Sequence, residues 1–174
     1  LLAVGRLAAR KGYGTLIRGF SALNKEMPNT KLVIVGRGHL KRRLMRLAKS
    51  LGVGEDVTIE SSLSFAELAQ LYRSSDLVVY PSFYEGQGLI PLEAMASGVP
   101  VVTVDHGPLP EMVDESVGAL FTMGDIESMV SVMKEVLKAG RKKGEKGRSR
   151  VLQKFTYSGN AESFENIYLE AINR

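Results

Sequence analysis

Two glutamates near the middle of the chain have the type and spacing of a site for a hydroxyl-rich ligand. Glu85 lies in a glycine-rich loop, and Glu93 lies about one and a half turns into the helix that follows. A carboxylate accepts hydrogen bonds from vicinal hydroxyls, which a ribose or a hexose offers. Gly86 and Gly88 let the backbone approach a ligand and leave helix N–H groups free for phosphate. We expect both carboxylates to face one crevice, although a glycine turn before a solvated acid gives the same pattern.

A second group of polar residues follows the first apolar run. Residues 5–12 contain two glycines and the cations Arg6, Arg10 and Lys11, and a helix is expected directly afterwards. Cations beside the free N–H groups of a helix N-terminus bind anions such as phosphate. A solvated surface loop explains the segment equally well. Neither this segment nor residues 36–38 contains the three spaced glycines of the dinucleotide fingerprint.

The apolar runs before these loops predict buried parallel strands, because they are rich in Val, Ile and Leu without polar alternation. They cover residues 1–5, 31–35, 57–59, 77–80, 99–104 and 118–121. Helical patterns cover residues 14–26, 40–51, 64–72, 88–97, 125–139 and 157–174. The prediction is an α/β fold, a doubly wound Rossmann-like parallel sheet of about six strands flanked by helices. In such sheets the ligand binds in loops at the carboxyl ends of the strands.

Composition limits the classes of function. A chain of 174 residues suits one domain, and no apolar stretch approaches the roughly 20 residues that span a bilayer. The absence of cysteine and the presence of only two histidines exclude thiolate and histidine-rich metal sites.

The net charge of +4 is concentrated at residues 41–49 and 138–150, and residues 140–150 are expected to be a basic linker. Solvated surface, an anionic membrane and nucleic acid are the alternatives for these charges. Aromatic residues are not interleaved with them, which argues against nucleic acid as a partner. We expect a cytoplasmic protein, with contact to the membrane face as an option.

Five segments in sequence order resemble one enzyme family. They are residues 4–12, 33–38, 69–76, 85–89 and 93–102. They resemble the C-terminal domain of family-4 retaining glycosyltransferases of the GT-B fold, which glycogen and sucrose synthases share. The resemblance extends from about residue 4 to residue 157. It implies that residues 1–174 are a single nucleotide-sugar-binding domain, the C-terminal half of a GT-B enzyme whose N-terminal acceptor domain is absent.

The resemblance also implies roles for particular residues. Arg6 and Lys11 would hold the donor's diphosphate and offset the charge on the leaving group, and Glu85 would face the sugar. These three would be the catalytic residues, and Glu93 would accept the ribose hydroxyls. The implied donor-binding set is Gly5, Arg6, Lys11, Gly36, Ser62, Leu63, Glu85, Gly86, Gln87, Gly88, Leu89 and Glu93. Arg, Lys and a helix dipole would do what a divalent cation does elsewhere, so no metal and no cofactor is expected.

The implied activity is that of a retaining, metal-independent hexosyltransferase in polysaccharide or glycolipid biosynthesis. Its donor would be a UDP-, GDP- or ADP-hexose, its own N-terminal domain would hold the acceptor, and the isolated chain would have little turnover. A non-catalytic nucleotide-sugar-binding or interaction module of the same fold is the alternative. Gln87 and Pro108 depart from the usual Phe and Gly of the family, which leaves the sugar and the base open.

Overall fold

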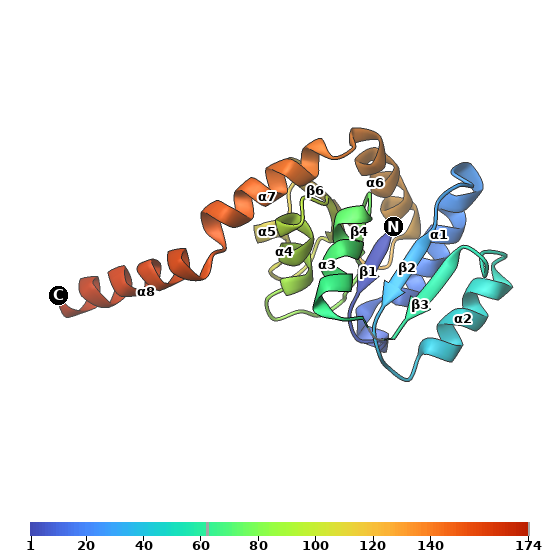
Figure 1. Cartoon of the computed structure of the whole chain (residues 1–174), viewed down its shortest axis with the longest axis horizontal. Coiled ribbons are helices and arrows are strands. Elements are labelled where there is room, and N and C mark those ends of the chain that lie inside the picture. Colours follow the sequence, from blue (N-terminus) through green and yellow to red (C-terminus); the bar gives the residue numbers. More distant parts are fainter. Residues whose placement is uncertain (62, 174) are drawn as a thin grey trace.

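The six apolar runs of the sequence form one parallel sheet. The computed structural model describes residues 1–61 and 63–173, and within these the strand order is β3-β2-β1-β4-β5-β6 (Figure 1). Every neighbouring pair is parallel, which confirms the predicted doubly wound fold. The strands are β1 (Leu2–Val4), β2 (Leu32–Val35), β3 (Val57–Glu60), β4 (Val78–Tyr80), β5 (Val101–Val104) and β6 (Gly118–Phe121).

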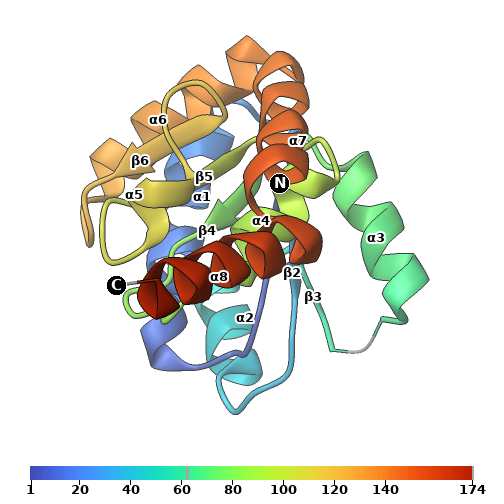
Figure 2. The same ribbon diagram turned by 90° about the vertical axis from the view of Figure 1, so that its left-hand side faces the viewer.

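Helices cover both faces of the sheet, as right-handed crossovers require. One face carries α1 (Tyr13–Glu26), α2 (Lys41–Ser50) and α6 (Ile126–Ala139). The other carries α3 (Phe65–Ser74), α4 (Leu89–Ala96) and α7 (Lys142–Lys154) (Figure 2). Shorter elements are η1 (Ala9–Lys11), a 3₁₀ turn, and α5 (Leu109–Met112). The last helix, α8 (Tyr157–Ile172), projects away from the sheet (Figure 1), and no described helix is long and apolar enough to cross a membrane.

The core lies between the sheet and these helices. α1 shows how the sequence builds it, because apolar residues at helical spacing are fully buried there: Leu16, Ile17, Phe20 and Leu23. Each such side chain contributes about 1.5–3 kcal/mol by leaving water. The prediction of burial on both faces is wrong for β3, because this strand is at the edge of the sheet and exposes Thr58 and Glu60.

Two predicted helix starts are confirmed by their caps. Ser64 N donates to Glu67 Oε2 at 2.7 Å, and Glu67 N donates back to Ser64 Oγ at 3.3 Å. At the start of α6, Ser128 N donates to Asp125 Oδ1 at 2.9 Å. Such a cap contributes about 1 kcal/mol and fixes where the helix begins.

The strand order reverses between β1 and β4. From β1 the chain continues outward to β2, whereas from β4 it continues to β5 on the other side. The loops after β1 and β4 therefore leave in opposite directions and open a crevice at the carboxyl ends of the strands. Arg6 and Lys11 follow β1, and Glu85 follows β4. The topology thus brings the predicted site residues to one place.

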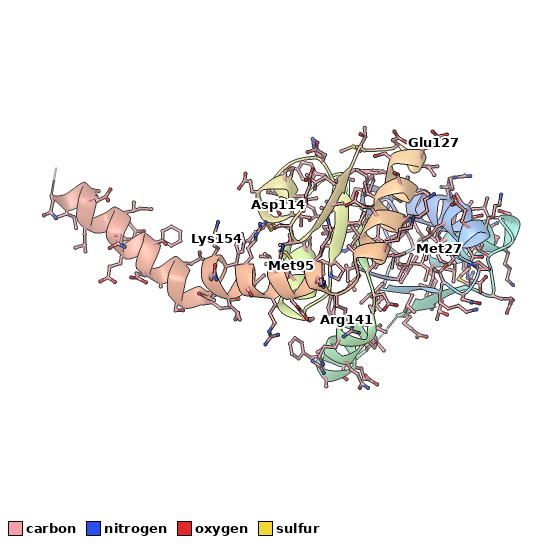
Figure 3. The ribbon with its side chains drawn as sticks, turned by 90° about the horizontal axis from the view of Figure 1, so that it is seen from above. Met27, Met95, Asp114, Glu127, Arg141 and Lys154 are labelled. Atoms are coloured by element: carbon pink, nitrogen blue, oxygen red, sulfur yellow. The ribbon has the colours of Figure 1, made fainter. Side chains whose placement is uncertain are left out.

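The prediction of a basic linker at residues 140–150 is wrong, because most of this segment belongs to α7. Gly144 and Gly147 are buried where α7 crosses α4. A Cβ on Gly144 would lie 2.1 Å from the carbonyl oxygen of Gly98, and one on Gly147 would lie 3.0 Å from Cγ of Met95, which Figure 3 labels. These glycines permit a close helix contact, which helix propensity does not reveal.

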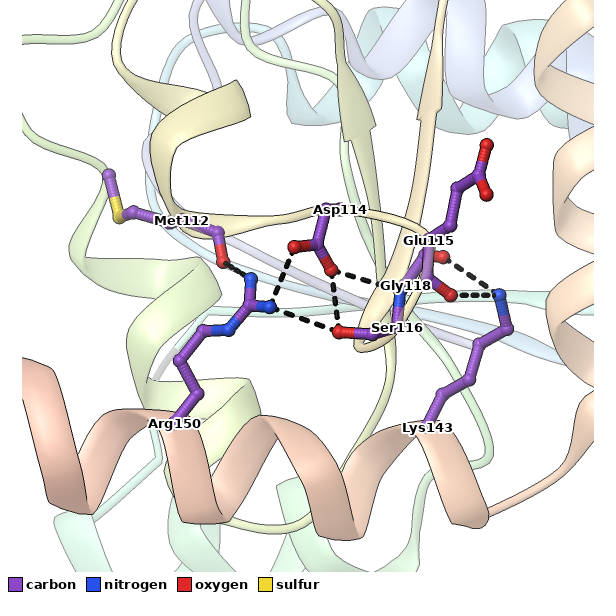
Figure 4. Close-up of polar contacts among 7 residues, drawn as sticks. All are labelled: Met112, Asp114, Glu115, Ser116, Gly118, Lys143 and Arg150. Atoms are coloured by element: carbon purple, nitrogen blue, oxygen red, sulfur yellow. Dashed lines mark hydrogen bonds and ion pairs between the residues drawn. The ribbon is translucent and has the colours of Figure 1, made fainter.

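Arg150 of α7 holds the loop between α5 and β6 (Figure 4). Its guanidinium donates to the carbonyl oxygen of Met112 at 3.0 Å, to Asp114 Oδ2 at 2.6 Å and to Ser116 Oγ at 3.0 Å. Hydrogen bonds from Arg150 and Ser116 lower the pKa of Asp114 from 3.8 to about 2. The contact with Met112 also fixes the end of α5.

Lys143, two turns earlier on α7, contacts the same loop (Figure 4). Its Nζ donates to the carbonyl oxygens of Glu115 at 2.6 Å and of Gly118 at 3.1 Å. Part of the basic charge of α7 therefore has a structural use, whereas Lys142 and Lys146 are exposed.

We expect Gly144→Ala to destabilise the fold and Gly14→Ala to leave it unchanged or slightly more stable. Alanine is favoured over glycine in a helix by up to about 1 kcal/mol. At Gly144 the methyl group would collide with the backbone, which costs about 1–3 kcal/mol and outweighs that gain. At Gly14 no described heavy atom lies within 4 Å of the added Cβ. Urea unfolding compares the two variants, and equal free energies of unfolding would contradict the packing of α7 on α4.

We expect Asp114→Asn to lower the free energy of unfolding at neutral pH but not at strongly acidic pH. A carboxylate with a lower pKa in the folded state than in the unfolded state stabilises the fold above its unfolded pKa of 3.8, and this stabilisation is lost as the pH falls toward about 2. The side chain is 54% exposed, so we expect at most about 1 kcal/mol. Urea unfolding of both proteins between about pH 3 and 8 measures this difference. A difference independent of pH would exclude the Arg150 contact as its source.

Candidate functional site

The loops after β1 and β4 touch at the point where the strand order reverses. Gly12 has a φ of +68°, and a Cβ on it would lie 2.0 Å from the carbonyl oxygen of Pro81. Phe83 N donates to the carbonyl oxygen of Arg10 at 2.8 Å. Only glycine combines this left-handed backbone with so close a contact. The backbone therefore fixes the position of Lys11 relative to the loop that carries Glu85.

Lys11 and Glu85 form an ion pair across the two loops. Their side chains are only 14% and 13% exposed. Lys11 Nζ also donates to the hydroxyl of Tyr80 at 3.2 Å and lies 5.5 Å from the centroid of its ring. Tyr80 is the last residue of β4, so the strand itself delivers this phenol to the site. A largely buried carboxylate requires such donors, because an unpaired charge there is strongly unfavourable.

The surroundings of Glu85 keep it ionised. Burial by itself would raise the pKa of Glu85, but hydrogen bonds from Lys11, Ser82 and Tyr80 outweigh burial and lower it below its ordinary value. Burial and the hydrogen bond with Glu85 raise the pKa of Tyr80, so the phenol stays protonated. At neutral pH the site therefore presents a fixed carboxylate that accepts hydrogen bonds.

Gly88 brings the start of α4 to the same place. Its φ is +83°, and a Cβ there would lie 2.8 Å from Leu109 Cδ2 and 3.1 Å from Met112 Cε, so α5 packs directly behind this loop. Among the described residues, no side chain caps α4. The first N–H groups of the helix, those of Leu89 and Ile90, are therefore suited to an anion.

The rest of the loop faces solvent beside a cavity. Gly86 and Gln87 are exposed, and Leu89 is 58% exposed. Gln87, Leu89 and Glu93 line a cavity of about 500 Å³ between α4, the end of α7 and the start of α8. A sugar or nucleotide group in this cavity would meet both an amide and a carboxylate.

Glu93 is exposed on α4, and its Oε2 accepts a hydrogen bond from the hydroxyl of Tyr72 at 2.9 Å. Tyr72 belongs to α3 and is 3% exposed. Tyr72 interacts electrostatically with Tyr13 and Tyr80, and Tyr80 with Glu85, so a set of phenols lies between the two glutamates. That both carboxylates face one crevice stays a prediction.

Tyr13 completes this set of phenols. It is 2% exposed, and its hydroxyl has no hydrogen-bond partner among the described residues. A Cβ on Gly5 would lie 2.9 Å from this hydroxyl, which places Tyr13 directly under the end of β1. Burial and the charge of Glu85 raise its pKa, so the phenol is neutral. Glycine at position 5 makes room for it.

The predicted glycine at position 36 is a packing residue. A Cβ on Gly36 would lie 1.9 Å from the carbonyl oxygen of Gly5, whose own N–H donates to Val35 O at 2.9 Å. The loop after β2 therefore lies against the loop after β1. Arg6 follows directly and is exposed, free to reach a ligand at this edge.

The residues after β3 include two of the predicted donor-binding residues, Ser62 and Leu63. Arg37 Nε donates to the carbonyl oxygen of Ser61 at 2.8 Å, and Lys41 Nζ donates to Ser61 Oγ at 2.8 Å. Leu63 is half-buried, and Ser62 lies outside the described residues. Two cations thus hold the start of this segment next to the loop after β2.

Charged residues of the candidate site could be selected from the sequence, but several aromatic and basic residues that lie around them were not. Tyr13, Tyr72 and Tyr80 were not selected, and neither was Arg37. For Tyr80 a signal existed, because a polar group at the carboxyl end of a central strand faces the ligand crevice. For Tyr13 and Tyr72 none existed, since a tyrosine at helical spacing equally fits an ordinary core.

A family model matches the part of the chain that carries this arrangement. The model of the glycosyl transferases group 1 matches residues 1–151. The chain belongs to this family. The match includes every element that carries the site, from β1 through most of α7, and confirms the resemblance found in the sequence. Group 1 membership is consistent with a domain for a nucleotide-sugar donor.

Individual relatives agree with the family. Mannosylfructose-phosphate synthase of Agrobacterium fabrum is 34% identical over 174 residues, which cover 93% of this chain and 38% of that protein. A GDP-mannose-dependent α-(1-6)-phosphatidylinositol monomannoside mannosyltransferase of Mycolicibacterium smegmatis is 33% identical over 145 residues, 79% of this chain and 38% of that protein. The chain therefore spans well under half the length of these relatives.

A solved structure of matching extent shares the fold. The C-terminal domain of a glycosyl transferase group 1 family protein from Francisella tularensis has a TM-score of 0.81 at 25% identity. The match covers 90% of this chain and 86% of that one. The predicted GT-B C-terminal fold is thereby confirmed.

Lys11→Met is expected to lower the free energy of unfolding by about 2 kcal/mol at neutral pH, because it leaves the Glu85 carboxylate largely buried without its cation. The variant lacks the hydrogen bond and the charge by which Lys11 lowers the pKa of Glu85, so only the wild-type protein loses this stabilisation as the carboxylate is protonated at falling pH. The loss should therefore shrink below about pH 5. The double variant with Glu85→Gln should recover most of the stability. A loss that is the same at every pH, measured by urea unfolding, would contradict the ion pair.

Proposed function

We propose that this chain is the donor domain of a retaining glycosyltransferase that takes a hexose from a nucleoside diphosphate. The observation that carries the proposal is the convergence of three features where the strand order reverses. They are the Lys11–Glu85 pair, the uncapped start of α4 among the described residues, and Glu93 further along the same helix. Together they offer a cation, free N–H groups and two carboxylates.

The diphosphate would bind between Lys11 and the start of α4. Arg6 is exposed at the same edge and can grip two phosphate oxygens, whereas Lys11 acts as a point charge. A phosphate oxygen competes with Glu85 for Lys11, so binding frees the Glu85 carboxylate toward the sugar hydroxyls. The cations and the N–H groups then stabilise the charge that develops on the leaving phosphate. Because these groups supply the positive charge, the proposal needs no metal and no other cofactor.

The sugar and the nucleoside would lie on either side of the diphosphate. Glu85 and the backbone N–H groups of Gln87, Gly88 and Leu89 would contact the sugar. Glu93 would accept the ribose hydroxyls, and the loop that contains Leu63 would contact the base. The GDP-mannose-dependent relative makes mannose and guanine one option for the donor.

The acceptor would be held by a second, N-terminal domain. The chain spans only 38% of each relative described above. Among its described residues α8 buries none, and Phe164, Ile167 and Ile172 are 60%, 59% and 78% exposed. An exposed apolar helix face of this kind fits a domain interface. Transfer would therefore require both domains, and the isolated chain would bind the donor with little turnover.

The alternative is a non-catalytic nucleotide-sugar-binding module of the same fold. It would bind the donor equally well, but it would have no need of an ionised Glu85 held beside the sugar position. A cytoplasmic location, with contact between basic α7 and anionic lipid, stays a prediction from the sequence.

Calorimetric titration with UDP, GDP, ADP and their hexose conjugates, with and without a chelator, tests the proposal. We expect one nucleotide to bind selectively and chelator to have no effect. Glu93→Ala and Lys11→Ala should each weaken binding by roughly tenfold or more, since each loses a charged hydrogen bond.

Activity separates the enzyme from the binding module. Joined to an N-terminal domain, the chain should transfer the hexose, and Glu85→Gln should abolish transfer while nucleotide binding persists. Absence of binding to all three nucleotides in a folded sample would overturn the proposal, and binding without transfer in the two-domain protein would favour the module.

A further inference from the structure

Glu93 has one described side-chain contact, the hydroxyl of Tyr72. The hydroxyl donates to Oε2 of Glu93 at 2.9 Å and joins α3 to α4. Glu93 is otherwise exposed, and a free glutamate of this kind loses side-chain entropy when a ligand fixes it. A carboxylate already held by Tyr72 loses less on binding, so this contact bears on ligand affinity.

Tyr72 is well placed to hold that carboxylate. It is the one buried residue among the described residues of α3, and the Ser64–Glu67 capping box fixes the start of the same helix. Burial and then the charge of Glu93 raise the pKa of Tyr72. The phenol is therefore protonated at any working pH and always a donor, and its ring cannot turn away without leaving the core.

The contact leaves the ligand side of Glu93 open. Glu93 lines the cavity that Gln87 and Leu89 also line, on the side of α4 that faces α7 and α8. A carboxylate offers about four lone-pair directions over its two oxygens, so one phenol leaves room for two hydroxyls.

We propose that Tyr72 is a positioning residue that orients Glu93 to accept the vicinal hydroxyls of the donor's ribose. The inference rests on the proposed function, because it takes Glu93 as the ribose ligand. Tyr72, a buried residue on a neighbouring helix, would thereby contribute to the selectivity for a ribose that has its diol over a sugar that lacks it. Tyr72 itself does not touch the ligand.

The test compares nucleotides that have or lack the diol. Calorimetry first identifies which of UDP, GDP and ADP binds best, and the same measurement is made with its 2′,3′-dideoxy counterpart. Tyr72→Phe removes only the hydroxyl. It should weaken binding of the ribonucleotide about tenfold, because the carboxylate loses a charged hydrogen bond, and should leave binding of the dideoxynucleotide unchanged.

Two further variants separate positioning from packing. Glu93→Gln should show the same loss, and the double variant should lose little more than either single variant, because both act on one contact. Ser74→Ala is the matched control: it removes another hydroxyl of α3, which donates to the carbonyl oxygen of Leu71 at 3.1 Å, and should change neither affinity.

The remaining outcomes of these titrations would refute either the inference about Tyr72 or the proposed function. If Tyr72→Phe weakens both nucleotides equally, the residue acts through the packing of α3 and the inference fails. The inference would also be refuted if Tyr72→Phe bound both nucleotides with the affinity of the wild-type chain. If the wild-type chain binds both nucleotides equally, Glu93 is not the ribose ligand, and the inference fails while the donor site stands. If the wild-type chain binds no nucleotide, the proposed function fails and the inference fails with it.

Discussion

The close contact between the loops after β1 and β4 is the constraint on which the site depends. Without a side chain at Gly12, one loop lies directly against Pro81 of the other. This backbone contact sets the distance across which Lys11 meets Glu85. The sheet supplies the opposed directions of the two loops, and the ion pair then needs no movement of the chain to form. Electrostatics in this site is therefore a consequence of backbone geometry.

Much of the fold could be predicted from the sequence because its signals are local. Strand runs, helix periodicity and the caps at Ser64 and Asp125 depend on residues a few positions apart. α7 could not be predicted, because its glycines and charges indicate a linker unless the neighbouring helix is known. Only glycine fits at position 144 because the carbonyl oxygen of Gly98, 46 positions earlier in the sequence, lies beside it.

The charged residues and the phenols of the site differ in the same way, since only the former could be selected from local signals. Charged residues after strands, such as Lys11 and Glu85, could be selected because the topology rule assigns their loops to the ligand. The phenols could not be selected, because their hydrogen-bond partners are far along the chain. Tyr72 and Glu93 are 21 positions apart, and Lys11 and Tyr80 are 69 positions apart. A sequence shows which residues can carry charge, whereas packing decides which of them are held still.

The construction of α7 also bears on how the protein can change over time. Its two glycines form the contact with α4, while exposed cations such as Lys142 and Lys146 make no described contact with the core. Replacing those cations alters the surface potential without altering the helix position. Substitutions of those cations would therefore change the charge of this surface, whereas a side chain at either glycine would push α7 away from its contact.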